Sequence, residues 1–157
     1  MTGSVSYPSE QFPAFPPVSL SLPEGWQPIT SPAVLLAVGA EPQEGQFRAN
    51  VVVTATRFPP GLSLAAATEM IVDKFIGLPE LAEIGREGHT VLGQPGFRYE
   101  ASYSDQRVGA LVQVVHLTVF DRGVVTDLVQ VTAICTGEQA LSILPQLRAI
   151  ADSAVTS

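Results

Sequence analysis

The stretch ALVQVVHLTVFDRGVVTDLVQVTAIC, residues 110–135, holds two long runs of β-prone side chains on either side of Asp121-Arg122-Gly123. Valine, isoleucine, threonine and phenylalanine dominate both runs, and these residues favour extended backbone. Asp-Arg-Gly is typical of a tight turn, so the runs are predicted to be neighbouring antiparallel strands. Both are apolar on two faces, which indicates central strands that are covered on both sides.

Further strands are predicted on the N-terminal side of this pair. Residues 47–58 alternate between an apolar and a polar face, which is typical of a strand with one face in the core. Residues 90–103 predict two strands joined by a turn at residues 94–96. Shorter strands are expected at residues 18–22 and 33–39. Long strands joined by tight turns predict an antiparallel sheet.

Two helices complete the pattern. Ser63 is a suitable N-cap for a helix that ends near Pro79, because apolar residues recur at helical spacing after Ser63. Thr136 and Gln139 fit a capping box that opens a last helix. Pro145 lies inside that helix, so a kink or a restart is expected there. The predicted fold class is therefore α+β: an antiparallel sheet packed with helices, in one domain over residues 18–155.

Residues 1–17 are predicted to form a proline-rich extended tail, because proline donates no backbone hydrogen bond. The tail also contains Phe12 and Phe15. These rings are expected to lie on the domain, and docking on a partner is the alternative. The tail shows no basic start or apolar stretch of a leader peptide. A cytoplasmic location is expected for the sequence as given, and an exported or cell-envelope location if a leader has been removed.

Composition and charge exclude several classes of function. The chain has 157 residues, a net charge of -7 and only 15% charged residues. Its few cations are scattered, which argues against nucleic acid or an anionic membrane surface as a partner. No apolar run reaches the roughly 18–20 residues that span a bilayer.

The residues that could carry chemistry do not form a known motif. His89 and His116 lie far apart on different predicted elements, so neither a metal site nor a cofactor site is predicted. Cys135 lies in a strand-like apolar run and is expected to be a small buried thiol. His116 is expected to be a structural histidine rather than a base that acts on Cys135.

The acidic residues also have structural explanations. Three glutamates at positions 80, 83 and 87 are expected to form a solvated acidic corner rather than a cation site. Asp121 and Asp127 flank the predicted hairpin turn, and turn solvation is expected to account for both. No catalytic residue is therefore predicted.

One polar surface remains a candidate for binding. Polar residues alternate with apolar ones on two predicted strands, and they would form one patch if the strands share a face of the sheet; cross-strand pairing on a wet sheet face is the alternative. A second hypothesis is a pocket for an apolar small molecule whose polar contacts come from tyrosine, histidine and arginine. The candidate contact residues are Arg48, Asn50, Thr54, Arg98, Glu100, Tyr99, Tyr103 and His116.

Four stretches together resemble the LpqN/LpqT-type family of actinobacterial proteins, within a PsbP-like superfamily. They are FPPVSLSLPEGWQ at 15–27, FRANVVVTATRFPPG at 47–61, GQPGFRYEASY at 93–103 and LVQVTAICTGEQA at 128–140. The resemblance implies an α/β/α sandwich built on an antiparallel sheet. Many members of that family are lipoproteins, whereas Cys135 is the only cysteine here and does not precede the domain.

The resemblance implies binding rather than catalysis. It supplies no catalytic residues, and relatives in the superfamily act as accessory subunits or partners of other proteins. The first hypothesis is therefore a non-catalytic interaction or accessory domain that binds a protein through a sheet face or edge. Self-association is a further expectation, since the surface carries few charges. The small-molecule binder is the alternative, and an enzyme is the least favoured.

Overall fold

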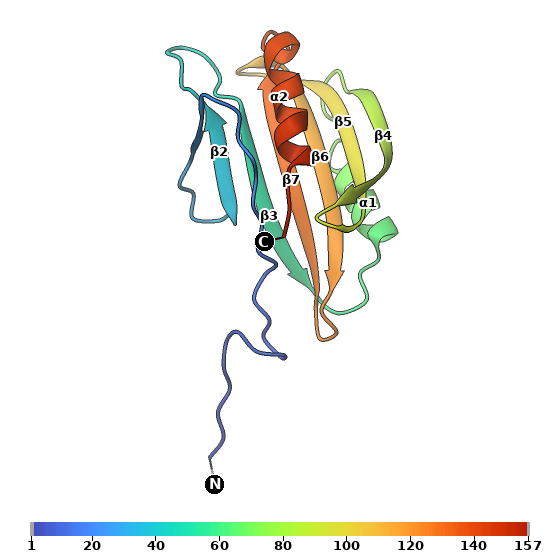
Figure 1. Cartoon of the computed structure of the whole chain (residues 1–157). Helices are drawn as coiled ribbons and strands as arrows, with labels where there is room; N and C mark the ends of the chain where they lie inside the picture. Colours follow the sequence, from blue (N-terminus) through green and yellow to red (C-terminus); the bar gives the residue numbers. More distant parts are fainter. Residues whose placement is uncertain (1, 157) are drawn as a thin grey trace.

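The computed structural model describes residues 2–156 and contains one seven-stranded antiparallel sheet and two helices (Figure 1). The strand order is β1-β2-β3-β7-β6-β5-β4. The elements are β1 Trp26–Pro28, β2 Leu36–Ala40, β3 Asn50–Phe58, α1 Leu64–Asp73, β4 Ala82–Val91, β5 Gln94–Asp105, β6 Gly109–Asp121, β7 Thr126–Thr136 and α2 Ala140–Asp152. The predicted α+β class and the antiparallel sheet are confirmed.

The two helices cover opposite faces of the sheet. Figure 1 shows α2 in front of β6 and β7, and α1 behind the sheet near β5. The α2 side of the core contains Val51 and Val53 of β3 packed with Leu147 and Ile150 of α2. The α1 side contains Ile71 and other apolar side chains of α1 packed on β5 and β6. Strands β6 and β7 are thus central, as predicted, but helix α1 covers β6 and only the Leu128 end of β7, so cover on both faces is incomplete for β7.

The stretch before β1 closes the α2 side of the core. Gly25 has φ +89°, a conformation that glycine adopts without strain, and it turns the chain into Trp26. The indole of Trp26 is buried, and its Nε1 donates a hydrogen bond to Oε1 of Gln146 at 2.7 Å. Trp26 therefore joins β1 to α2 and belongs to the scaffold.

The predicted N-cap Ser63 is confirmed, and the predicted Thr136–Gln139 hydrogen bonds form, although α2 itself begins only at Ala140. Oγ of Ser63 accepts a hydrogen bond from the backbone N–H of Ala66 at 3.1 Å. The backbone N–H of Thr136 donates to Oε1 of Gln139 at 2.9 Å, and the N–H of Gln139 donates to Oγ1 of Thr136 at 3.1 Å. Of the kink or restart expected at Pro145, the restart is wrong, because the last helix runs through Pro145 unbroken. Its packing on the sheet compensates for the one hydrogen bond that proline removes.

Three strand predictions need correction. Residues 18–22 form no strand; Ser19 makes an isolated bridge with Val155 instead. The turn predicted at 94–96 lies at Leu92-Gly93, where φ is +53° and +74°, as a two-residue hairpin turn with two left-handed residues requires. Pro95 is consequently a strand residue opposite Thr90. Residues 82–91 form β4 rather than an acidic corner.

The other end of the sheet holds a buried charge that the sequence pattern missed. Asp127 is fully buried and is bound by Arg57 through two hydrogen bonds of 2.8 and 2.9 Å. Arg122 adds a third at 3.3 Å. Solvation at the turn therefore does not explain Asp127. Asp121 is exposed and accepts the N–H of Gly123, as expected for a turn residue.

The proline-rich segment before Val18 lies partly against this charged cluster. The ring of Phe15 lies 4.5 Å from the guanidinium carbon of Arg57, and Arg122 donates a hydrogen bond to the carbonyl of Ala14 at 2.8 Å. Phe12 is half exposed. Among residues 2–17, none belongs to a helix or strand.

Candidate functional site

Three side chains from three distant parts of the sequence meet beside the C-terminal end of α2. His89 comes from β4, His116 from β6, and Asp152 is the last residue of α2. Nε2 of His89 lies 3.0 Å from Oδ1 of Asp152, and Nδ1 of His116 lies 3.9 Å from the same oxygen. The two imidazole rings meet edge to face with centroids 4.9 Å apart. We call these three residues the histidine–aspartate cluster.

A closely packed glycine on β5 lies beside this cluster. Strand β5 separates β4 from β6, and neighbouring strands lie about 4.8 Å apart, so a side chain must cross β5 to connect them. The residue opposite His89 on β5 is Gly96, which has no side chain to block the path. A Cβ at Gly96 would lie 2.5 Å from the carbonyl oxygen of Leu117 and 2.7 Å from Cγ2 of Val91. A larger residue at position 96 would therefore clash with these two neighbouring strands.

The His116 imidazole is buried without a conventional partner. Its exposed fraction is 2%, and burial is the main cause that lowers its pKa from 6.5 to about 4, with His89 and Arg98 adding to the effect. The ring is therefore neutral near pH 7. Its Nδ1 is beyond hydrogen-bond distance of Asp152, and Nε2 has no hydrogen-bond partner among residues 2–156. Buried ring nitrogens normally have a partner, so this ring is exceptional.

A charged network borders the cluster. Arg98 of β5 lies opposite His116 in the sheet and binds Glu100 of β5, while its Nε donates to Oε1 of Glu87 at 2.9 Å. Arg148 of α2 binds the same Glu100 carboxylate at 2.7 Å. Glu100 is buried, and the two arginines compensate its charge. The two arginines and two glutamates sum to zero, so Asp152 gives the whole region one net negative charge when both histidines are neutral.

The pair of Cys135 and His116 is not brought together. Cys135 lies opposite Val112, four residues along β6 from His116, which corresponds to about 13 Å along a strand. The Cys135 thiol is fully buried, and burial raises its pKa to about 11. This geometry gives the thiolate no access to substrate.

The eight residues expected to make contacts divide between the two faces of the sheet. Asn50 and Thr54 of β3 point away from α2, since Val51 and Val53 point toward it. Arg98 and Glu100 lie on the α2 side, where Glu100 meets Arg148. One continuous patch is therefore not formed. Arg48 precedes β3, and its Nε donates to the carbonyl of Ala40 at 2.8 Å.

The four residues expected to line a small-molecule pocket are also separated. Tyr99 is buried on the α1 side, where its ring meets Phe75 at 5.0 Å between centroids. Tyr103 lies on the same side and donates its hydroxyl to Oε1 of Gln113 at 2.8 Å. His116 and Arg98 lie on the α2 side. Alternation along β5 places these groups on two faces, so they do not line a common pocket.

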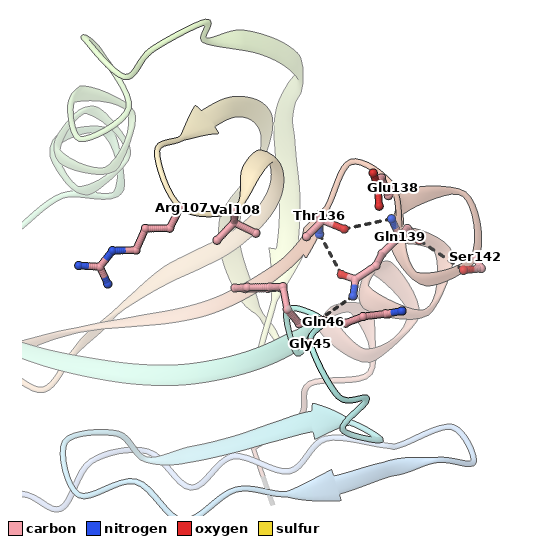
Figure 2. A pocket seen from close by; sticks show the side chains of 9 residues that line it. Gly45, Gln46, Arg107, Val108, Thr136, Glu138, Gln139 and Ser142 are labelled. Atoms are coloured by element: carbon pink, nitrogen blue, oxygen red, sulfur yellow. Dashed lines mark hydrogen bonds between the residues drawn. The ribbon is translucent and has the colours of Figure 1, made fainter.

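A hollow lies at one end of the sheet, and a polar side chain in its lining, Gln139, is already hydrogen-bonded within the protein. The hollow has a volume of about 660 Å³ and lies between the loop before β3, the β5–β6 turn and the start of α2 (Figure 2). Gln139 uses its side-chain amide within the protein: Oε1 accepts from Thr136, and Nε2 donates to the carbonyl of Phe47 at 2.7 Å. Figure 2 shows the Thr136 and Gln139 side chains turned toward each other just before α2.

Among residues 2–156, no helix covers the β1–β3 half of the sheet on the α1 side. Helix α1 packs on β5 and β6, and its apolar cluster extends only to Leu128 of β7. Beyond it, uncharged side chains of β3 and β7 form cross-strand pairs and are all half-buried. We call this surface the open face; its residues are Asn50, Val52, Thr54, Gln130, Thr132 and Ile134.

No sequence pattern points to Asp152 or Arg148. His89 is recognisable as a candidate ligand, but its distance from His116 in the sequence hides their contact, because residues 82–91 lack the apolar alternation of a strand. Asp152 is 63 residues from its partner His89 along the chain, so no local pattern links the two. The strongest signal available was Gly96, a glycine inside a strand pattern, which marks a close approach of neighbouring groups.

Comparison with known proteins identifies the architecture. No protein-family model and no curated protein matches the chain. The crystal structure of LpqN, involved in cell envelope biogenesis of Mycobacterium tuberculosis, matches with a TM-score of 0.77 and 14% identity, over 91% of this chain and 84% of LpqN. The solution structure of cyanobacterial PsbP from Synechocystis sp. PCC 6803 matches with a TM-score of 0.54 and 14% identity, over 99% and 98%. The chain has an LpqN- and PsbP-like fold.

The LpqN- and PsbP-like fold confirms, for architecture, the resemblance carried by the four sequence stretches. The Ran-binding protein Mog1p of Saccharomyces cerevisiae is also similar, with a TM-score of 0.55 and 12% identity over 88% of this chain and 89% of Mog1p. Among residues 2–156, neither helix combines the length and apolar character needed to cross a bilayer.

Proposed function

We propose that this protein is a non-catalytic accessory domain that binds a protein partner through the open face. The observation that carries the proposal is the missing helical cover over β3 and β7. This face pairs Val52 with Thr132 and Thr54 with Gln130, so apolar groups alternate with hydrogen-bonding groups. Its six residues include no ionisable side chain. Interface cores are likewise depleted of charge and combine apolar contact with a few hydrogen bonds.

The edges of the sheet are poorer docking sites than the open face. The edge strand β1 has three residues and ends at Pro28, which cannot donate a ladder hydrogen bond. The opposite edge, β4, has a bulge between Glu83 and Gly85 and exposes charged side chains. Short strands, bulges and charges all oppose edge-to-edge pairing. We therefore favour the face over the edge.

Charge favours a different protein over a second copy of this chain. The net charge is -7, so two copies would repel each other at low ionic strength. A partner with an uncharged contact surface and basic surroundings would complement both the open face and the acidic remainder. The similarity to Mog1p, a Ran-binding protein, supports a protein as the partner. LpqN acts in cell envelope biogenesis, which makes an envelope component a reasonable class to test first.

The site chemistry supports binding over catalysis. His116 does meet an acid, Asp152, but the imidazole is only 2% exposed. The Cys135 thiol is buried and lies far along the sheet from it. A nucleophile within hydrogen-bond distance of a base, as covalent catalysis needs, is not among the described contacts of either residue.

The proposal can be tested by site-specific photocrosslinking in cells of the source organism. A photoreactive residue at Thr132 should capture one defined protein. The same residue at Leu141, which is 95% exposed on α2 and lies on the other side of the sheet, should not capture it. The captured protein is then purified, and its affinity for this domain is measured by calorimetry.

Two matched variants decide the result. Thr132→Arg places a charge in the open face and should weaken binding of the purified partner at least about tenfold, because an unpaired charge would be desolvated. Thr30→Arg makes the same change at an exposed loop position and should leave the affinity unchanged. Equal affinity of Thr132→Arg and wild type would refute the proposal. So would crosslinks from Thr132 that join only copies of this chain.

A further inference from the structure

The histidine–aspartate cluster has the composition and spacing of a metal site. One ring nitrogen each of His89 and His116 and a carboxylate oxygen of Asp152 lie within 4.8 Å of one another. Ligand atoms of a tetrahedral zinc ion at about 2.0–2.1 Å are about 3.3 Å apart. The separations of 3.0 and 3.9 Å to Oδ1 of Asp152 lie on either side of that value. The His89 and Asp152 side chains are both partly exposed, and both would have to adjust for all three atoms to reach one ion.

The state of His116 provides an independent observation. Its ring is almost fully buried, its Nε2 has no hydrogen-bond partner among residues 2–156, and its Nδ1 lies 3.9 Å from Oδ1 of Asp152. Nδ1 is the ring nitrogen nearer to Asp152, so an ion held by the three residues would bond Nδ1 and leave Nε2 as the protonated nitrogen.

We propose that His89, His116 and Asp152 bind a divalent transition-metal ion, with zinc as the natural candidate. Two imidazole nitrogens with one carboxylate suit zinc and similar ions, whereas magnesium and calcium prefer oxygen ligands. The local charge is also compatible, because Glu87 and Glu100 neutralise Arg98 and Arg148, and Asp152 adds one negative charge. The His89 and Asp152 side chains are 32% and 56% exposed, so a fourth ligand can approach from solvent.

Metal binding would connect parts of the chain that the sheet does not connect directly. The three ligands come from β4, β6 and the C-terminal end of α2. A bound ion would therefore hold the edge hairpin and the helix end together, and it would stabilise the folded state in proportion to its occupancy. This inference does not depend on the proposed protein partner.

The first test is zinc titration of tag-free, EDTA-treated protein by calorimetry and native mass spectrometry. Wild type should bind one zinc ion per chain and should not bind magnesium at the same concentration. His89→Gln and Asp152→Asn, both at partly exposed positions, should weaken zinc binding at least about tenfold. Asp73→Asn is the matched control, because Asp73 is exposed and is likewise the last residue of its helix. It should bind zinc as wild type does.

The second test uses the presence of only two histidines in the chain. Long-range ¹H–¹⁵N spectra of the imidazoles should show two ring systems, and zinc should shift Nε2 of His89 and Nδ1 of His116. The opposite nitrogen of each ring should then carry the proton. Zinc should also raise the Tm of wild type and of Asp73→Asn, and should leave the Tm of His89→Gln nearly unchanged.

Three outcomes would overturn the proposal. The first is no saturable binding of one zinc per chain at micromolar concentrations. The second is equal zinc affinity of wild type, His89→Gln and Asp152→Asn. The third is zinc binding that leaves the His116 ring signals unshifted, since binding would then lie elsewhere on the surface.

Discussion

At the scale of single residues, burial decides how each ionisable group behaves. Asp127 and Glu100 are both buried and each is bound by two arginines, whereas Asp121 is exposed and serves only its turn. A buried charge is costly unless it is paired, so removing one member of such a cluster has a large effect. The two aspartates Asp121 and Asp127, six residues apart, are therefore expected to contribute very differently to stability.

Asp127→Asn should lower the free energy of unfolding by about 3 kcal/mol, because it leaves two arginines without their counter-charge. Urea unfolding followed by circular dichroism measures the change. Asp121→Asn is the control and should cost less than about 1 kcal/mol, since its hydrogen bond is exposed. Equal effects of the two substitutions would show that the Asp127 cluster is not a buried charge cluster.

Cys135 should resist alkylation in the folded protein. Burial raises the pKa of its thiol to about 11, so thiolate is scarce at pH 8, and no reagent reaches a fully buried sulfur without opening of the sheet. Mass spectrometry after iodoacetamide treatment should show slow labelling in buffer and rapid labelling in urea. Rapid labelling of the native protein would contradict the buried position.

At the scale of elements, the β4–β5 hairpin contains most of what the sequence pattern misplaced. Its turn is Leu92-Gly93. On β5, Gly96 packs so closely against Leu117 of β6 and Val91 of β4 that a Cβ would not fit. Strand β4 is exposed along most of its length and contains two glycines and several charges, so it lacks the apolar alternation that identifies a strand. Pairing with β5, rather than its own composition, makes this segment extended.

Gly96→Ala should destabilise the protein by about 1–3 kcal/mol, because the added Cβ meets a backbone oxygen that cannot move freely. Gly88→Ala is the matched control: Gly88 lies on β4 of the same hairpin, and a Cβ there meets nothing within 4 Å. Urea unfolding should show a much smaller change for the control. Similar changes for both would mean that close packing at Gly96 is not limiting.

At the scale of the whole molecule, the segment before Val18 contributes to stability although it forms no helix or strand. Phe15 and Ala14 contact Arg57 and Arg122, the two arginines that hold Asp127. The segment therefore covers the charged end of the sheet. It is continuous with the strand-free stretch that leads into Trp26.

Deleting residues 1–17 should lower the free energy of unfolding by about 1–3 kcal/mol, from the lost cation–π contact and hydrogen bond. Deleting residues 1–6 is the control and should change it little, because residues 2–6 are exposed. Thermal unfolding of the three proteins under one condition measures both effects. An unchanged Tm after the longer deletion would show that the tail is energetically independent of the domain.

The sequence alone determined the features that depend on local periodicity. The apolar runs on either side of Asp121-Arg122-Gly123 required central antiparallel strands, and Ser63 and Thr136 marked the helix starts. Each of these signals lies within a few residues, where strand alternation and capping hydrogen bonds operate. The same local logic correctly placed Cys135 in the core.

Only the tertiary structure decided which distant side chains meet. His89, His116 and Asp152 come together because β4 pairs with β5, Gly96 leaves space between β4 and β6, and α2 ends above them. Asn50 and Arg98, in contrast, do not meet, because side-chain alternation along their strands places them on opposite faces of the sheet. Strand order and facing are set by packing over the whole chain, and no short stretch of sequence contains that information.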